Sequence, residues 1–155
     1  MNRKIPDNLE SIARDLKGAY ILEFEFTMSH SPICLEVGKL GNIVLEKGYY
    51  YYIGSARGGL RGRLIRHFTG EGKVHWHIDY LTKLIMPVRA FYVVSEKKIE
   101  NKLALILSRI CTPMVKGFGS SDVRSSVTHL FYSKKQMKFL RELREFGEVG
   151  VIERN

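Results

Sequence analysis

The sequence predicts a small mixed α/β domain of the α+β class, in which a mostly antiparallel sheet is flanked by helices. Two observations lead to this prediction. Segments that alternate every second residue, as strands do, are interleaved with segments whose apolar residues recur at helical spacing. A short turn joins two of the strand-like segments, which favours antiparallel pairing. The chain has 155 residues, and we expect a single domain over residues 1–155 with its core in residues 15–135.

The N-terminal part is expected to contain a short helix, a long strand and a hairpin. Asn8 can cap the helix and Gly18 can end it. Residues 19–27 then alternate between two faces, as in a strand. One face carries Tyr20, Leu22, Phe24 and Phe26, and the other carries Ile21, Glu23 and Glu25. Residues 33–37 and 42–46 flank a glycine-containing turn, which predicts a hairpin.

Strands and helices are expected to alternate through the rest of the chain. Further strands are predicted in the tyrosine segment after Gly48, at 88–94 and at 129–132, and helices at 60–68, from residue 76 onward, at 99–110 and at 134–146. The last of these helices carries many charges of both signs and is expected to close the domain.

The charge balance favours a polyanionic partner. The chain contains 25 Lys and Arg against 16 Asp and Glu, a net charge of +9, which points first to DNA and leaves RNA open. A membrane partner is disfavoured, because no long basic amphipathic helix with an aromatic face is evident. No apolar run has the length of a membrane span and the start lacks a signal sequence, so we expect a cytoplasmic protein. Cys34 and Cys111 belong to no Cys-x-x-Cys pair and are expected to be reduced and buried.

A tyrosine cluster precedes an arginine-rich helix. Residues 49–52 are four consecutive tyrosines, and Tyr50 and Tyr52 would share one face of a strand. Four arginines follow within ten residues: Arg57, Arg61, Arg63 and Arg66. Arg63 and His67 are four residues apart and lie together at the edge of the apolar stripe of the predicted helix. A guanidinium group is well suited to bind phosphate. Either residue taken alone is read as structural, that is, as a surface arginine or a half-buried histidine.

Glu100 is the second unusual residue. It falls on the same helical arc as the apolar Ile99, Leu103 and Leu107. A carboxylate on a core-facing arc needs an arginine, a helix N-terminus or a cation as its partner. A hard cation such as Mg²⁺ is the sharpest of these alternatives, and all three stay open at this point.

Together these residues resemble the GIY-YIG nuclease superfamily, over about residues 15–135. That superfamily combines a Gly-Ile-Tyr strand, a Tyr-Ile-Gly strand, a helix with Arg-x-x-x-His and a glutamate on a later helix. Tyr52-Ile53-Gly54 matches the second motif, Arg63 and His67 match the helix pair, and Glu100 matches the glutamate. Gly18-Ala19-Tyr20 is taken as the first motif, with Gly48-Tyr49-Tyr50 as its rival.

Four further stretches are similar to one branch of that superfamily: GSARGGLRGR, HWHIDYL, GFGSSD and HLFY. In this branch the domain also occurs fused to an endonuclease III-like repair glycosylase, which makes such a glycosylase a candidate partner. Tyr20 and Tyr52 are 32 residues apart, more than is usual in the superfamily, and the predicted hairpin accounts for the extra length.

The resemblance implies a metal-dependent DNA endonuclease that acts in repair or recombination with one divalent cation, Mg²⁺ first and Mn²⁺ as the alternative. It implies catalytic roles for Tyr20, Tyr52, Arg63 and His67, and metal binding by Glu100. Nucleic-acid contacts are expected from Gly54, Ser55, Arg57, Arg61, Arg66, His75 and His77. We expect the two tyrosine hydroxyls to converge near Arg63, where the arginine and the cation would lower their pKa toward that of a useful base.

Several alternatives stay open on the sequence. The main one is a nucleic-acid-binding module on the same fold that turns over no substrate. A zinc site built from His67, His75, His77 and Cys111 lacks a standard ligand spacing. The glycine-serine loop that ends in Asp122 suits either a cleft wall or an ordinary turn, and His129 is expected to be structural.

Overall fold

A computed structural model describes residues 3–27, 32–119 and 128–154. Its centre is a six-stranded sheet with the order β6-β7-β4-β1-β5-β8, and each neighbouring pair is antiparallel. The strands are β1 Gly18–Phe26, β4 Gly48–Ala56, β5 Arg89–Val94, β6 Thr112–Pro113, β7 Leu130–Ser133 and β8 Val149–Glu153. The predicted α+β class with an antiparallel sheet is therefore confirmed.

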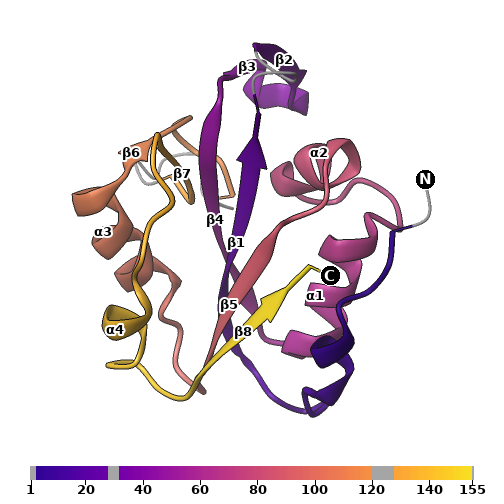
Figure 1. Cartoon of the computed structure of the whole chain (residues 1–155), viewed down its shortest axis with the longest axis vertical. Coiled ribbons are helices and arrows are strands. Elements are labelled where there is room, and N and C mark those ends of the chain that lie inside the picture. Colours follow the sequence, from indigo (N-terminus) through magenta and orange to yellow (C-terminus); the bar gives the residue numbers. More distant parts are fainter. Residues whose placement is uncertain (1–2, 28–31, 120–127, 155) are drawn as a thin grey trace.

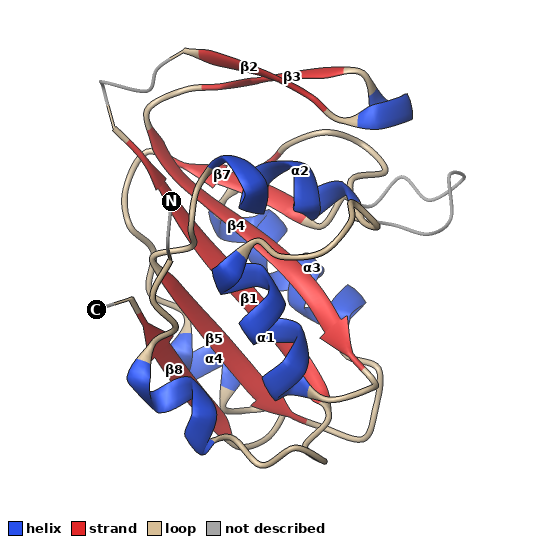
Figure 2. Cartoon of the chain, turned by 90° about the vertical axis from the view of Figure 1, so that its right-hand side faces the viewer, coloured by secondary structure: helices blue, strands red, loops and turns tan. Residues whose placement is uncertain are grey.

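Helices cover both faces of this sheet. In Figure 1 the helices α1 (Leu60–Thr69) and α2 (His77–Leu84) lie on one side of the strands, and α3 (Glu100–Ile110) and α4 (Leu140–Leu143) lie on the other. Figure 2 shows α1 and α2 in front of the sheet face that they cover. No helix within residues 3–27, 32–119 and 128–154 is both long and apolar enough to traverse a lipid bilayer.

The two helical layers enclose two separate hydrophobic cores. The predicted alternation of β1 is confirmed, because Tyr20, Leu22, Phe24 and Phe26 pack into the core beneath α1 and α2. Ile21 packs into the opposite core with Tyr51 of β4, whereas Tyr50 and Tyr52 join the first core. Both central strands are thus buried on both faces, and each tyrosine belongs to the core on the face toward which its side chain points.

The predicted hairpin is also present. Strands β2 (Ile33–Glu36) and β3 (Asn42–Leu45) form a separate two-stranded sheet beyond one end of β1 and β4 (Figure 1). The connection between β1 and β4 is long because it contains this hairpin. The two long strands nevertheless pair along their whole length, with Tyr20 opposite Gly54 and Leu22 opposite Tyr52.

Three local predictions are wrong. The N-terminal helix is a 3₁₀ helix over Asp7–Ser11 that starts after Pro6, and Gly18 opens β1 instead of ending a helix. The predicted helix at 134–146 shrinks to the four residues of α4, and the missed strand β8 follows it. Cys34 is exposed and Cys111 is half-buried, so neither thiol is a fully buried core residue, although both are free.

Residues 134–139 form no helix, and partners on the sheet hold them in place. Tyr51 Oη accepts a hydrogen bond of 2.8 Å from the backbone N–H of Met137 and donates one of 2.8 Å to the buried Glu23 carboxylate. Gln136 donates to the same carboxylate, which also receives two hydrogen bonds from Arg89. These contacts compensate the burial of Glu23. They also hold residues 136 and 137 in a non-helical path, where the charge pattern alone suggests a helix.

Candidate active site

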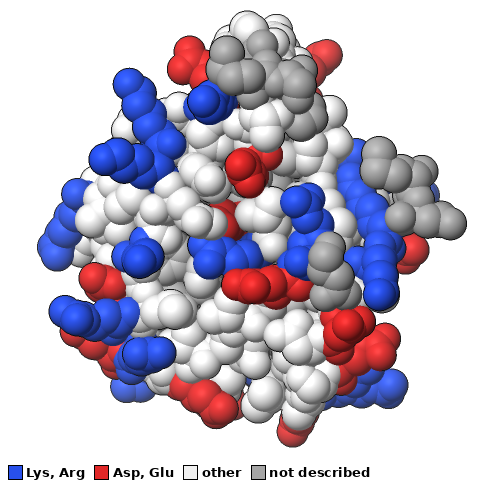
Figure 3. All heavy atoms as spheres, in the orientation of Figure 1, with Lys and Arg blue, Asp and Glu red and all other residues white. Residues whose placement is uncertain are grey.

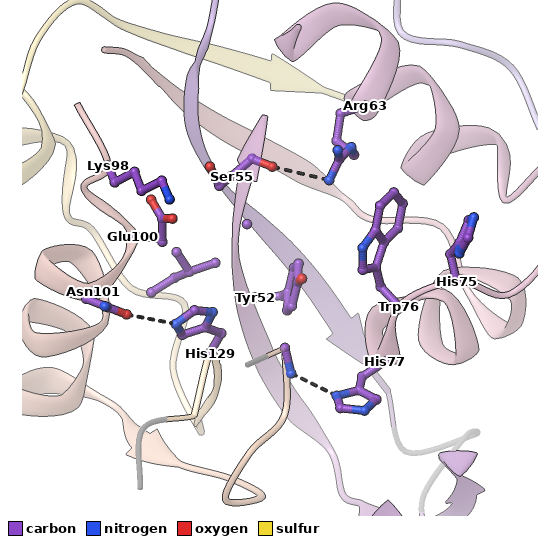
Figure 4. Close-up of a pocket in the computed structure, with 13 residues that line it drawn as sticks. Tyr52, Ser55, Arg63, His75, Trp76, His77, Lys98, Glu100, Asn101 and His129 are labelled. Atoms are coloured by element: carbon purple, nitrogen blue, oxygen red, sulfur yellow. Dashed lines mark hydrogen bonds between the residues drawn. The ribbon is translucent and has the colours of Figure 1, made fainter. Parts of the chain in front are cut away.

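A polar cleft of about 680 Å³ opens where β4 meets the N-termini of α2 and α3. The side chains that line it are shown in Figure 4. Among them are seven of the predicted site residues: Tyr52, Gly54, Ser55, Arg63, His75, His77 and Glu100. The cleft also contains Ile53, Trp76, Lys98, Asn101, Gly119 and His129, which were not predicted as site residues.

Tyr20 and His67 lie behind the cleft and form a buried pair. Tyr20 Oη and His67 Nε2 are 2.7 Å apart and share a hydrogen bond, and both residues are almost completely buried. The two motif tyrosines lie on the paired strands β1 and β4, and their ring centroids are 6.4 Å apart. Only Tyr52 lines the cleft. Tyr20 and His67 therefore support Tyr52 from below.

Gly54 makes this arrangement possible. It stands opposite Tyr20 in the register, and the Tyr20 ring lies directly across it. A Cβ atom at position 54 would overlap the Tyr20 ring and its hydroxyl. The Tyr-Ile-Gly glycine thus has an intramolecular role, because it lets the Tyr20 hydroxyl reach across β4 to His67.

The tyrosine hydroxyls are neutral in this structure. Burial raises the pKa of Tyr20 and Tyr52 well above the ordinary value of 10.0, and the opposing effect of the Arg63 charge is smaller. Burial also lowers the pKa of His67 from 6.5 to about 3, so this histidine is uncharged at neutral pH. The expected lowering of the tyrosine pKa by Arg63 is outweighed by desolvation.

Arg63 is the arginine of α1 that faces the cleft. Its guanidinium group donates a hydrogen bond of 3.2 Å to the Ser55 carbonyl oxygen and lies 4.2 Å from the centre of the Trp76 ring (Figure 4). Half-buried and without a carboxylate partner within the described residues, it retains donors for an anion.

The other predicted arginines differ from Arg63. Arg66 forms an ion pair of 2.8 Å with the buried Asp79, and Arg57 donates to the Glu96 carbonyl oxygen. Neither they nor Arg61 line the cleft. Figure 3 shows Lys and Arg side chains spread over the visible face and interspersed with Asp and Glu. The structure therefore gathers only part of the predicted arginine cluster at the site.

Glu100 is the first residue of α3, and its carboxylate reaches the cleft. Its Oε2 atom is buried and has no hydrogen-bond partner among the described residues. Such an atom suits a cation, because a buried carboxylate oxygen without a partner is otherwise costly. A single protein carboxylate with several water ligands is a common arrangement for Mg²⁺.

The zinc alternative finds no support in the described part of the chain. No group of three or more His, Cys, Asp and Glu side chains in residues 3–27, 32–119 and 128–154 is placed to hold a metal ion. Within the proposed zinc set, His67 is already committed to Tyr20. Asp122 lies outside the described residues.

Two histidines flank the Tyr52 side of the cleft. His77 Nδ1 accepts a hydrogen bond of 3.0 Å from the Gly119 backbone N–H, which links α2 to the segment after β6. His129 Nε2 lies 3.4 Å from Asn101 Oδ1, and His129 lines the cleft although it was expected to be only structural. Burial lowers the pKa of both histidines.

Sequence reasoning missed three of the polar or aromatic cleft residues. Lys98 and Asn101 bracket Glu100 closely in the sequence, and Trp76 stands between His75 and His77. The available signal was that they neighbour predicted site residues in the sequence. The sequence did not show that their side chains face the cleft, because this depends on where α2 and α3 begin.

Comparison with known proteins gives one match. The family model described as "Domain of unknown function DUF123" matches residues 19–150. No significant match is found among curated proteins or among solved structures. The matched stretch runs from β1 into β8 and includes the whole cleft. The chain belongs to the DUF123 family.

Proposed function

We propose that this protein is a metal-dependent DNA endonuclease of the GIY-YIG type that hydrolyses phosphodiester bonds in DNA repair or recombination. The observation that carries this proposal is the buried Glu100 Oε2 atom, which has no hydrogen-bond partner among the described residues and lies in the same cleft as Arg63 and Tyr52. A carboxylate for a cation, a guanidinium for a phosphate and a hydroxyl for a water are the groups that phosphodiester hydrolysis requires.

Arg63 would bind the scissile phosphate and stabilise the charge that develops on it. Its position beside Ser55, whose carbonyl oxygen accepts one of its hydrogen bonds, orients the guanidinium toward the cleft. Glu100 would hold one divalent cation, which supplies Lewis-acid stabilisation of the leaving oxygen. Mg²⁺ fits this oxygen donor best, and Mn²⁺ is the alternative.

Tyr52 would orient the attacking water through its neutral hydroxyl. Because burial raises the pKa of Tyr52, its hydroxyl keeps its proton while no metal and no DNA are bound. In that state the hydroxyl can orient a water molecule. Tyr20 and His67 would position Tyr52 from the core side, because the Tyr20 ring and the His67 ring both contact it with centroids 6.4 Å away. The raised pKa values of Tyr20 and Tyr52 also favour a second candidate function, a DNA-binding module without turnover, because a neutral hydroxyl is a poor base.

Cleavage assays separate these two functions. The protein is incubated with nicked, branched, damaged and plain duplex DNA in Mg²⁺, Mn²⁺ or EDTA, with Arg63→Ala as a companion variant. The proposal expects at least one substrate to be cut in the presence of either cation, none in EDTA, and none by Arg63→Ala. Tight binding to these DNAs with no cleavage under any condition identifies the binding module instead.

A further inference from the structure

Trp76 is the only tryptophan of the chain, and it is exposed in the cleft. Trp76 is 37% exposed, although tryptophan is usually well buried. Figure 4 shows it between Arg63 and His75, on the side of the cleft opposite Glu100. A single exposed aromatic residue is common on protein surfaces, but the Trp76 ring is also held by charged neighbours.

A network of buried and charged groups fixes this ring in place. The Arg63 and Arg66 guanidinium groups lie 4.2 and 4.4 Å from its centre. Arg66 is anchored by its ion pair with Asp79, and Asp79 Oδ2 also accepts the backbone N–H of Trp76 at 2.9 Å and that of His75 at 2.7 Å. Asp79 is 3% exposed. These contacts position the indole before any ligand binds, and such preorganisation reduces the entropy cost of binding.

The neighbours of the ring indicate the chemistry of its ligand. Arg63, the residue suited to a phosphate, touches the indole, so a phosphate bound there would bring its own nucleotide next to Trp76. Nucleobases stack on aromatic side chains whatever their sequence. A base inside an intact duplex has both faces covered by its neighbours and must be unpaired or extruded to reach a protein ring.

We propose that Trp76 stacks on an unpaired nucleobase next to the phosphate bound by Arg63. The substrate class is then DNA with an unpaired base at the cleavage site, such as a single-stranded flap, a bulge or an extruded base, rather than intact duplex. This inference rests on the proposed function, since it takes Arg63 as the phosphate-binding residue. Trp76 is a specificity-determining residue and takes no part in the bond-breaking step.

Intrinsic fluorescence tests this directly, because all tryptophan emission comes from Trp76. The protein is titrated in EDTA with three unlabelled DNAs of equal length: a single strand, the same strand with abasic sites, and a blunt duplex. Binding of each is measured in parallel by anisotropy of labelled copies. We expect the single strand to quench the emission at saturation, and the bound abasic strand and duplex to leave it nearly unchanged.

Variants give a second readout. Trp76→Ala should weaken single-strand binding by about 5- to 150-fold, the range of base–aromatic stacking, and leave binding of the abasic strand unchanged. Trp76→Phe should keep most of the affinity, which guards against a folding defect. Leu84→Ala is the matched control, because Leu84 is an exposed apolar residue at the other end of α2.

The outcomes are distinct. Equal quenching by the single and abasic strands, or an equal loss of affinity for both in Trp76→Ala, overturns the stacking role and leaves the nuclease proposal standing. Failure of all three DNAs to bind overturns the proposed function, and this inference falls with it.

Discussion

Tyr20→Phe should destabilise the protein far more than the loss of one surface hydroxyl does. The Tyr20 hydroxyl is the partner of His67 Nε2, at 2.7 Å. His67 Nδ1 already has no partner among the described residues, and the ring is completely buried. Without the hydroxyl, His67 would have neither ring nitrogen paired, and a buried polar atom left unpaired costs about 1–3 kcal/mol.

That magnitude translates into a measurable shift in thermal stability. For a chain of this size, a loss of 1–3 kcal/mol lowers Tm by about 2–12 °C. The free energy of unfolding is measured by urea titration at pH 7, followed by circular dichroism. Tyr92→Phe is the control, because the half-buried Tyr92 ring packs over Gly150 as Tyr20 packs over Gly54. Within residues 3–27, 32–119 and 128–154, no buried histidine forms a hydrogen bond with Tyr92.

A double-mutant cycle gives the stricter test. In Tyr20→Phe/His67→Leu neither partner remains, so the double variant should be more stable than the sum of the single losses predicts, by at least about 0.5 kcal/mol. The reasoning is refuted if Tyr20→Phe unfolds like the wild type and the two substitutions are simply additive.

Three further predictions concern Gly54, His67 and the basic groups that would bind DNA. Gly54→Ala should prevent stable folding or cost several kcal/mol because the new Cβ overlaps the Tyr20 ring, whereas Gly58→Ala, which meets no atom within 4 Å, should stay close to wild type in a thermal melt. The free energy of unfolding should fall as the pH drops from 6.5 toward 3, because His67 is protonated in the unfolded chain and stays neutral in the folded one. The contribution of His67 to this slope approaches about 1.4 kcal/mol per pH unit. Urea titrations of His67→Leu should therefore show a weaker dependence of stability on pH. DNA affinity should fall with salt with a log–log slope of about −5 if six phosphates are contacted, and a flat response between low and moderate salt would contradict binding through the basic groups.

The central strands could be predicted because their side chains follow simple periodicity. The alternation of β1 correctly places Tyr20 in the core beneath α1, and the same logic separates Tyr50 and Tyr52 from Tyr51. The four-residue spacing on α1 correctly brings Arg63 and His67 to one side of that helix. Their final positions differ, because Arg63 reaches the cleft and His67 is buried beneath it.

Contacts between distant segments explain what the sequence did not reveal. The non-helical path of residues 134–139 depends on Tyr51 and Glu23, which bind Met137 and Gln136. The local charge pattern does not reveal such partners, because they are distant in the sequence. The pKa of the tyrosines could not be foreseen either, because it depends on burial in the core that β1 and β4 form with α1 and α2.

The Glu100→Gln variant tests the central claim most directly. It keeps the shape of the side chain, removes the proposed metal ligand and removes one negative charge from the cleft. Single-turnover cleavage and DNA affinity are measured on the same samples, with Glu36→Gln as the control because Glu36 is an exposed glutamate on the β2–β3 hairpin. We expect Glu100→Gln to lose Mg²⁺-dependent cleavage and to bind DNA as tightly as the wild type or more tightly, while Glu36→Gln cleaves normally. Undiminished Mg²⁺-dependent cleavage by Glu100→Gln would contradict the assignment of Glu100 as the metal ligand.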